Sequence, residues 1–281
     1  MELKTVDLYN YFGLDKQDNM EGILTCYIQK TDIVGGENRR HPGVLILPGG
    51  GYAHVSLREG EPVALRLASV GYQAFVLTYS VAPARFPIAL REAAMAMRYI
   101  REHAEEWKID VDHVAAMGFS AGGHLCGLLG TLYDCPEVAD VGPAALLRPD
   151  ALGLCYPVAV SWGSTHAGSF QNLCGDDQLL WQRLSLDRLV RPDMPPVFLW
   201  HTRNDGAVPC RNSLLLAQAL EEAQVDFALH IYRNGQHGLS TADAQVYPAN
   251  QLPPVSWDVS GWLEALHKFW KEIGFEIREG A

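Results

Sequence analysis

Short apolar runs alternate along the chain with longer segments whose apolar residues recur every three to four positions. The run GVLIL at residues 43–47 is unbroken, as expected for a strand buried on both faces of a sheet. In residues 87–107, Leu90, Met97 and Ile100 fall on one helical stripe. The pattern predicts strands at 43–47, 74–79, 114–117, 151–155, 196–201 and 227–232, and helices at 61–70, 87–107, 121–132, 210–223 and 257–273.

This alternation predicts an α/β fold: a mostly parallel central sheet with helices on both faces, joined by right-handed crossovers. One stretch, residues 157–195, breaks the rhythm because Gly, Ser, Asn and Asp interrupt it and neither period persists. A loop this long in a compact domain is usually functional or disordered. We therefore expect residues 1–281 to form one domain that carries a short cap-like insertion at 157–195.

Composition narrows the class of protein. The 281 residues include 22 Lys and Arg against 33 Asp and Glu, a net charge of −11, and 48% are hydrophobic. This is ordinary globular composition, and one α/β domain can reach such a length. The acidic balance argues against a nucleic-acid partner, whose phosphates require clustered Lys and Arg.

The six cysteines are scattered without a CxxC pair, and Cys126 and Cys155 lie in apolar runs typical of a core. The N-terminal segment MELKTVDLYNYFGLDKQDN lacks the apolar centre of a signal peptide, and no stretch reaches the 18 apolar residues of a membrane span. We therefore expect a cytoplasmic protein without a membrane partner. The ten histidines show no HExxH or paired His/Cys spacing, so we expect neither a metal nor another cofactor.

The most specific motif is GFSAG at residues 118–122, between a predicted strand and a predicted helix. In this context the glycines permit a cramped turn that exposes a serine hydroxyl above the sheet. The alternative is a glycine-rich helix N-terminus with Ser120 as N-cap. The strand–turn–helix context favours Ser120 as a nucleophile.

A second motif, PGGGY at residues 48–52, directly follows the first predicted strand. Its three glycines allow backbone N–H groups to face a ligand oxygen, and with the N–H of Ala121 they would form an oxyanion hole. A phosphate loop is disfavoured, because the segment lacks a GK[ST] ending and the G-x-G-x-x-G spacing.

A nucleophilic serine needs a base and an acid that orients the base, both on loops after strands. Asp205 follows the predicted strand 196–201, in HTRNDGAVP. Its rivals Asp226, Asp187 and Asp193 all precede strands, which places them at the wrong end of the sheet. We therefore predict Asp205 as the acid.

The base is predicted to be His237, which lies in NGQHG after the strand 227–232. His230 lies inside that strand and is expected to pack in the sheet. His201 and His166 are further pocket candidates, although isolated histidines are more often structural.

These motifs resemble the α/β-hydrolase superfamily, in the esterase/lipase branch that contains acetyl esterases and acetylxylan esterases. The resemblance extends from about Leu45 to about Trp270. The hormone-sensitive-lipase branch usually carries HGGG, whereas this chain has Pro48 at that histidine, which shifts the expectation away from large lipophilic esters. The matching blocks are PGGGY (48–52), EGEPVALRLASVGY (59–72), YSVAP (79–83), GFSAGGHL (118–125), AGSFQNLCGDD (167–177), WHTRNDGAVP (200–209) and NGQHG (234–238).

The resemblance implies an α/β-hydrolase fold and a serine esterase that removes small acyl groups, acetyl above all, from carbohydrates such as acetylated xylo-oligosaccharides. By the same resemblance the catalytic triad is Ser120, Asp205 and His237, and the oxyanion donors are Gly50, Gly51 and Ala121. The alternatives are a broad short-chain carboxylesterase and an aryl-formamidase-like or peptidase-like amide hydrolase, because fold and motifs do not separate them.

The insertion is expected to cross the top of the sheet near Ser120. Trp162, His166 and Phe170 of the insertion, together with Tyr52, are candidate contacts for an oligosaccharide or small-molecule ester. The alternative is that these aromatic side chains only pack the insertion onto the domain. The oligomeric state cannot be read from the sequence.

Overall fold

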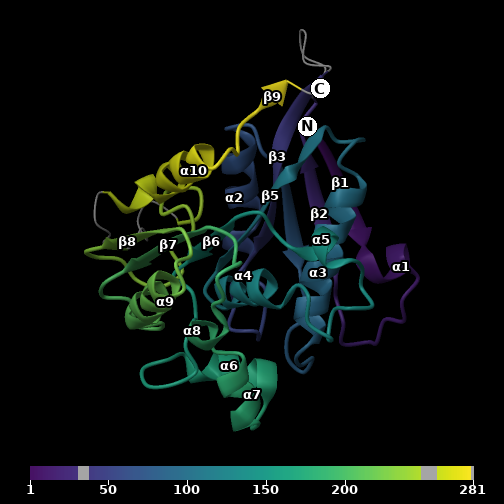
Figure 1. Cartoon of the computed structure of the whole chain (residues 1–281). Coiled ribbons are helices and arrows are strands. Elements are labelled where there is room, and N and C mark those ends of the chain that lie inside the picture. Colours follow the sequence, from purple (N-terminus) through teal and green to yellow (C-terminus); the bar gives the residue numbers. More distant parts are fainter. Residues whose placement is uncertain (31–37, 248–257, 280–281) are drawn as a thin grey trace.

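The strands form one twisted sheet in the computed structural model, which describes residues 1–30, 38–247 and 258–279 (Figure 1). Their order is β1-β2-β4-β3-β5-β6-β7-β8, and the short β9 pairs with the beginning of β3. The strands are β1 (Glu2–Asp7), β2 (Ile23–Ile28), β3 (Arg39–Leu47), β4 (Gln73–Thr78), β5 (Ile109–Phe119), β6 (Leu152–Cys155), β7 (Val197–Thr202), β8 (Phe227–Tyr232) and β9 (Arg278–Glu279).

The six predicted strands are all present, and the strands from β4 across to β8 run parallel, which confirms the mostly parallel sheet. The strands β1 and β2 were not predicted. They pair antiparallel with each other, and β2 joins the edge of the parallel strands by a further antiparallel pairing to β4.

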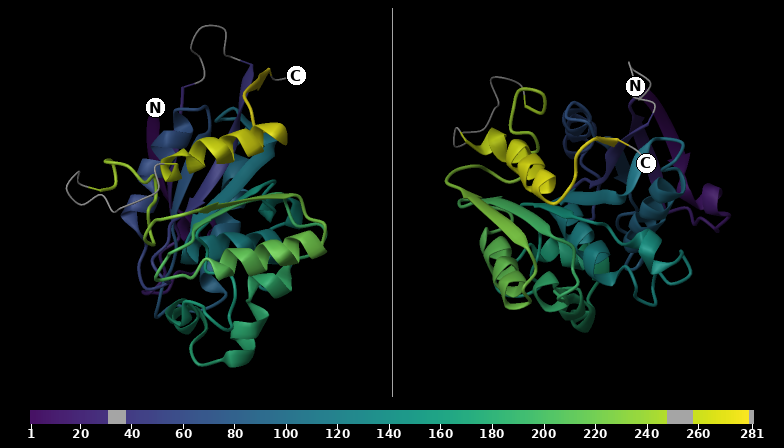
Figure 2. Two further views of the ribbon diagram at one scale, coloured as in Figure 1. Left: turned by 90° about the vertical axis from the view of Figure 1, so that its left-hand side faces the viewer. Right: turned by 45° about the horizontal axis from the view of Figure 1, so that its top comes forward.

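Helices cover both faces of the sheet, as predicted. Figure 2 shows α10 in yellow and α9 in green on opposite sides. The face that carries α9 also holds α3 and α4, and the other face holds α2. The helices outside the insertion are α1 (Leu8–Phe12), α2 (Glu61–Ala68), α3 (Ile88–Glu102), α4 (Ala121–Leu132), α5 (Ala144–Leu147), α9 (Arg211–Glu222) and α10 (Trp262–Glu272), with single 3₁₀ turns η1 (Leu57–Glu59) and η2 (Val259–Gly261). The predicted start of the last helix at residue 257 lies outside the described residues.

Side chains of β3 alternate between two apolar layers. Leu45 and Leu47 pack on the α3–α4 side, whereas Val44 and Ile46 pack on the α2–α10 side, and all four are fully buried. This double burial explains the unbroken apolar run. Because β3, β5, β7 and β8 are parallel, their carboxyl ends and the loops that follow them lie at one edge of the sheet.

The insertion at 157–195 contains three short helices: α6 (Ala167–Cys174), α7 (Gln178–Arg183) and α8 (Leu186–Leu189). Each spans at most eight residues, too few to establish a clear period in the sequence. In Figure 1, α6 and α7 lie together below the body of the domain. Phe170 and Trp181 stack with ring centroids 5.5 Å apart and join these two helices.

The six cysteines are free, and Cys126 and Cys155 are fully buried, as predicted. Within the described part of the chain, no helix is both long and apolar enough to span a bilayer.

Candidate active site

Ser120 lies at the sharp turn between β5 and α4. Its backbone has φ 54° and ψ −118°, a conformation that non-glycine residues rarely adopt. Two backbone hydrogen bonds maintain it: the Ser120 N–H donates to the Cys155 carbonyl at 3.0 Å, and the Val158 N–H donates to the Ser120 carbonyl at 3.1 Å. The strained turn is therefore anchored to the last residue of β6 and to the segment that follows it.

The glycines of the GFSAG motif are required by close backbone packing. A Cβ on Gly118 would lie 2.1 Å from the Gly122 carbonyl oxygen, and a Cβ on Gly122 would lie 2.0 Å from the Leu47 carbonyl oxygen. Neither contact is possible for a real side chain. The motif thus permits α4 to begin directly against the end of β3, with the serine held above the sheet.

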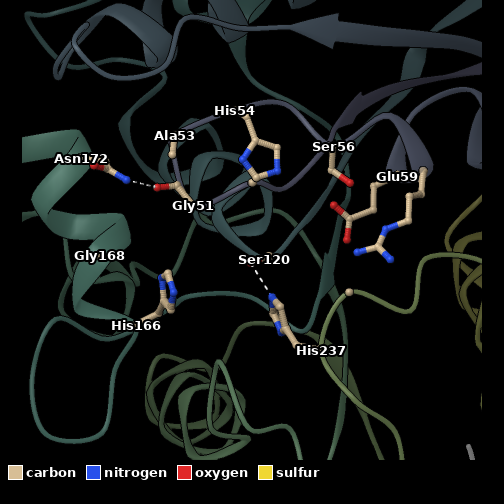
Figure 3. A pocket seen from close by; sticks show the side chains of 13 residues that line it. Gly51, Ala53, His54, Ser56, Glu59, Ser120, His166, Gly168, Asn172 and His237 are labelled. Atoms are coloured by element: carbon tan, nitrogen blue, oxygen red, sulfur yellow. Dashed lines mark hydrogen bonds between the residues drawn. The ribbon is translucent and has the colours of Figure 1, made fainter. Parts of the chain in front are cut away.

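The structure brings Ser120, His237 and Asp205 into one hydrogen-bonded chain. Ser120 Oγ lies 2.7 Å from His237 Nε2 (Figure 3), and His237 Nδ1 lies 2.7 Å from Asp205 Oδ2. An ionised carboxylate only accepts, so Nδ1 carries the proton that it donates to Asp205, and Nε2 is left to accept from the serine hydroxyl. This is the arrangement of a nucleophile, a general base and an orienting acid.

Asp205 is buried, but it keeps its charge. Burial raises the pKa of its carboxyl, and hydrogen bonds from His201 and His237 outweigh that effect, so the net pKa lies well below the ordinary value. The other carboxylate oxygen, Oδ1, accepts the backbone N–H groups of Ala207 and Val208, each at 2.9 Å. His201 is fully buried and lies outside the cavity lining, which makes it a support for Asp205 and not a pocket residue.

The glycines that follow β3 present backbone N–H groups near Ser120. The Gly49 N–H donates to Glu59 Oε2 at 2.8 Å, whereas the N–H groups of Gly50 and Gly51 have no acceptor among the described residues. Ala121 is the first residue of α4, where an N–H has no partner within its own helix. Gly50 and Gly51 both line the cavity. These groups can donate to an oxyanion formed at a carbonyl carbon bonded to Ser120.

A cavity of about 310 Å³ opens above Ser120. Asn172 of α6 closes one side and donates from Nδ2 to the Gly51 carbonyl at 2.9 Å (Figure 3). Small and polar residues dominate the lining, and Ala53 is its one aliphatic side chain among the described residues. The lining residues are Gly50, Gly51, Ala53, His54, Ser56, Arg58, Glu59, Ser120, His166, Gly168, Asn172, His237 and Gly238.

Of the four predicted substrate contacts, only His166 lines the cavity. Its Nδ1 lies 2.8 Å from Ser169 Oγ. Burial lowers the pKa of His166, and the neighbouring His237 lowers it further. The ring is therefore favoured in its neutral form, which can both donate and accept a hydrogen bond.

The other three predicted contacts do not line this cavity. Tyr52 is buried and donates its hydroxyl to His124 Nδ1 at 2.9 Å. Phe170 is buried between His124 and the insertion helix α7. Trp162 is 40% exposed, outside the cavity, and donates from Nε1 to Asp187 Oδ2 at 2.9 Å. For Phe170 the structure therefore favours the alternative interpretation, in which the insertion aromatics pack the insertion onto the domain.

Several cavity residues were not singled out from the sequence, although each lies in or near a matching block. Glu59 begins the EGEP block, and Asn172 lies within AGSFQNLC. His54 and Arg58 lie between the PGGGY motif and α2. Across residues 1–30, 38–247 and 258–279, no three His, Cys, Asp or Glu side chains are grouped so that they could hold a metal ion.

Two protein-family models match the chain. The model of the prolyl oligopeptidase family matches residues 92–252, and the BD-FAE model matches residues 32–142. The first range includes Ser120, Asp205 and His237, and the second includes Gly50, Gly51 and Ser120.

Curated relatives include xylan-related enzymes. The chain is 37% identical over 239 residues to endo-1,4-beta-xylanase B of Butyrivibrio fibrisolvens, covering 80% of this chain and 35% of that protein. It is 27% identical over 264 residues to an acetylxylan esterase of Xylanibacter ruminicola, covering 91% of this chain and 50% of the relative. The chain thus spans about a third to a half of the length of these two relatives.

Solved structures match over nearly the whole chain. The acetyl ester-xyloside bifunctional hydrolase from Caldicellulosiruptor lactoaceticus has a TM-score of 0.83 and 36% identity, with 97% of each chain covered. A carboxylesterase from Lactobacillus plantarum has a TM-score of 0.82 and 27% identity, with 98% of this chain and 99% of the other covered.

Proposed function

This chain belongs to the acetyl-esterase-like group of the α/β-hydrolase superfamily, and on that premise we propose that it hydrolyses esters of small acyl groups, acetyl above all, on carbohydrates such as acetylated xylo-oligosaccharides. The catalytic residues in this proposal are Ser120, His237 and Asp205. The oxyanion donors are the N–H groups of Gly50, Gly51 and Ala121.

The proposed reaction proceeds through an acyl-enzyme. His237 Nε2 takes the proton of Ser120 as Oγ attacks the ester carbonyl carbon, and Asp205 holds the imidazolium that forms. The oxyanion of the tetrahedral intermediate accepts the backbone N–H groups. The C–O bond to the alcohol then breaks, and His237 returns the proton to the leaving alkoxide. Water, deprotonated by the same base, attacks the acyl-enzyme and releases the carboxylic acid and the free serine.

The observation that carries the substrate class is the lining of the cavity. Ligand pockets are usually lined by hydrophobic and aromatic side chains, and a long acyl chain needs such a surface. This lining contains one alanine and otherwise glycine and polar or charged residues, including His54, Arg58, His166 and Asn172. Such a surface suits a short acyl group and a hydroxyl-rich alcohol. The names of the xylan-related relatives support the same choice.

The test is acetate release from acetylated xylo-oligosaccharides, measured beside the p-nitrophenyl esters of acetate, butyrate and octanoate. The proposal expects acetate release from the oligosaccharides and a kcat/KM that falls from acetate to octanoate. A kcat/KM that rises with acyl length refutes the acetyl preference. Hydrolysis of the short p-nitrophenyl esters without acetate release from the oligosaccharides identifies a short-chain carboxylesterase without sugar specificity.

A second candidate is hydrolysis of an amide, because the family model over residues 92–252 is that of the prolyl oligopeptidases. An aryl formamide and a p-nitroanilide dipeptide, assayed beside p-nitrophenyl acetate, distinguish the two. Turnover of either amide with a kcat/KM above that of the ester favours the second candidate. An amide rate far below the ester rate favours the esterase.

A further inference from the structure

Glu59 is a buried carboxylate on the wall of the catalytic cavity that the proposed reaction does not use. It ends the 3₁₀ turn η1 and is 3% exposed. In Figure 3, Glu59 and His166 lie on opposite sides of Ser120. A carboxylate removed from water is costly unless its oxygens accept hydrogen bonds, so its partners indicate what it does.

Each carboxylate oxygen of Glu59 accepts one hydrogen bond from a residue that lies beside the candidate catalytic residues. Oε2 accepts the Gly49 N–H at 2.8 Å, and Oε1 accepts the Tyr156 hydroxyl at 2.7 Å. The Tyr156 oxygen accepts in turn the Ser240 N–H at 2.9 Å. One side chain therefore connects the glycine loop after β3 with the loop after β8 that carries the candidate base.

On the glycine-loop side, Glu59 binds the first of three consecutive glycine N–H groups. It occupies the N–H of Gly49, and the next two N–H groups, of Gly50 and Gly51, remain without an acceptor in the described chain. The packing there is tight: a Cβ on Gly49 would lie 2.7 Å from Glu59 Oε2 and 3.0 Å from Ser120 Cβ. The Glu59 carboxylate and the Ser120 side chain therefore both pack closely against Gly49.

On the histidine side, the contact passes through Tyr156. Its ring lies edge-on to the His237 ring, with centroids 5.1 Å apart and an interplanar angle of 70°. Tyr156 is buried, and Ser240, which it binds, follows His237 by three residues. A displacement of the Tyr156 hydroxyl would therefore move both a wall of the imidazole and the loop that bears it.

We propose that Glu59 is a positioning residue that aligns the oxyanion donors Gly50 and Gly51 with the Ser120–His237 pair. This inference rests on the proposed function for the roles of those residues. It predicts a loss of rate in the chemical step, because misaligned donors stabilise the transition state less while the cavity still binds the substrate. A carboxylate that only anchors the loop would lower stability and leave kcat unchanged.

The variant Glu59→Gln separates these two roles. It retains the shape of the side chain, but it replaces one acceptor with an N–H₂ donor, so either the Gly49 N–H or the Tyr156 O–H loses its acceptor. Glu61→Gln is the matched control, because Glu61 is an exposed carboxylate two positions further on and does not line this cavity. Tyr156→Phe removes the same network at its other end and keeps the ring against His237.

The experiment measures kcat and KM for p-nitrophenyl acetate and the second-order rate of Ser120 labelling by a fluorophosphonate probe, with the thermal midpoint of each variant. We expect Glu59→Gln to lower kcat by about tenfold to a hundredfold and to change KM by no more than about threefold. Complete loss of an oxyanion donor lowers kcat by about 10²–10³-fold, so a misaligned donor should cost less. The labelling rate should fall by a similar factor. Tyr156→Phe should lower kcat and the labelling rate by smaller factors. In the double variant, the loss of rate should be smaller than the product of the two single losses. Glu61→Gln should match the wild type.

Wild-type kcat and labelling rate in Glu59→Gln overturn the inference, even if its thermal midpoint falls. If Glu59→Gln does not fold, Tyr156→Phe decides the question: an unchanged labelling rate in that variant overturns the inference, and a reduced rate supports it. Failure of the proposed function is a separate result. It shows as a lack of ester turnover by the wild type, whereas the ratio of labelling rates tests Glu59 without any ester.

Discussion

His201 Nε2 lies 3.3 Å from Asp205 Oδ2, the same oxygen that accepts from His237. The His201 ring is fully buried, with Nε2 also 2.8 Å from the Val208 carbonyl oxygen and Nδ1 2.7 Å from Ser213 Oγ. The carbonyl can only accept, which places the proton of His201 on Nε2, facing Asp205. Two imidazoles therefore bind Asp205, and of these only His237 lines the cavity.

Replacing His201 with Phe should weaken the hold on Asp205. The carboxylate loses one donor, its pKa rises toward the ordinary value, and it fixes the His237 ring less firmly. We expect kcat/KM for p-nitrophenyl acetate to fall by about tenfold, equivalent to about 1.4 kcal/mol. The control is His230→Gln, a half-buried histidine of β8 outside the cavity. A His201→Phe enzyme with the wild-type kcat/KM contradicts the assigned support.

Ser120→Ala should remove turnover and preserve the fold. Loss of the nucleophile in a triad of this kind costs about 10⁴-fold or more in rate. Alanine retains the Cβ at φ 54°, so the strained turn is neither relieved nor worsened. Acetate release and the thermal midpoint should be measured together. Sustained turnover in a folded Ser120→Ala protein would remove the serine from the mechanism.

Gly122→Ala should be strongly destabilising, because its Cβ would lie 2.0 Å from the Leu47 carbonyl oxygen. Backbone cannot move aside as a side chain can, so α4 must shift away from β3. We expect a loss of about 3 kcal/mol or more in the free energy of unfolding. Gly261→Ala is the matched control, since no heavy atom lies within 4 Å of the added Cβ there. Equal urea midpoints for the two variants would contradict the predicted clash.

His124 should make the fold sensitive to acid. Its buried ring donates from Nε2 to the Leu184 carbonyl at 2.7 Å and accepts from Tyr52, and burial lowers its pKa to about 4. The unfolded chain, with an ordinary histidine, binds this proton first as the pH falls. The stabilising contribution is thus complete above pH 6.5 and is lost as the pH falls toward about 4.

The measurement is urea unfolding of the wild type and of His124→Gln at pH 7 and pH 5. Between these pH values the wild type should lose about 2 kcal/mol more than the variant, because the variant no longer has the titrating group. Parallel losses in both proteins would show that His124 is not kept neutral by its surroundings.

The limits of helices and strands were predicted best where clear start and stop signals in the sequence mark both ends of the element. The predicted helix 121–132 and strand 227–232 coincide with α4 and β8, and the candidate triad residues lie on loops after strands, as chain order suggested. The strand β1 was not predicted because none of its residues is fully buried and no apolar run marks it.

Of the insertion residues predicted as substrate contacts, His166 lines the cavity and Phe170 does not, for a geometric reason. On α6, Gly168 and Asn172 are four residues apart and face the cavity, whereas Phe170 lies on the opposite side, against His124. Because the insertion has no clear period, the two sides of α6 could not be distinguished from the sequence. Phe170 was singled out for its aromatic ring, and Asn172 was not considered. The hydrogen bond of Glu59 to Tyr156 was not predictable because the two residues are 97 positions apart.

The division of the cavity between two parts of the chain has an evolutionary consequence. The hydrogen-bonded chain from Ser120 to Asp205 rests on the sheet, whereas α6 supplies His166 at its N-cap and Asn172 on one turn. In the proposed reaction, substitutions on α6 can therefore alter which alcohol is accepted while Ser120, His237 and Asp205 stay in place, although Asn172 also binds the Gly51 carbonyl. Selectivity and bond cleavage would then be able to change separately, because they depend on different segments of the chain.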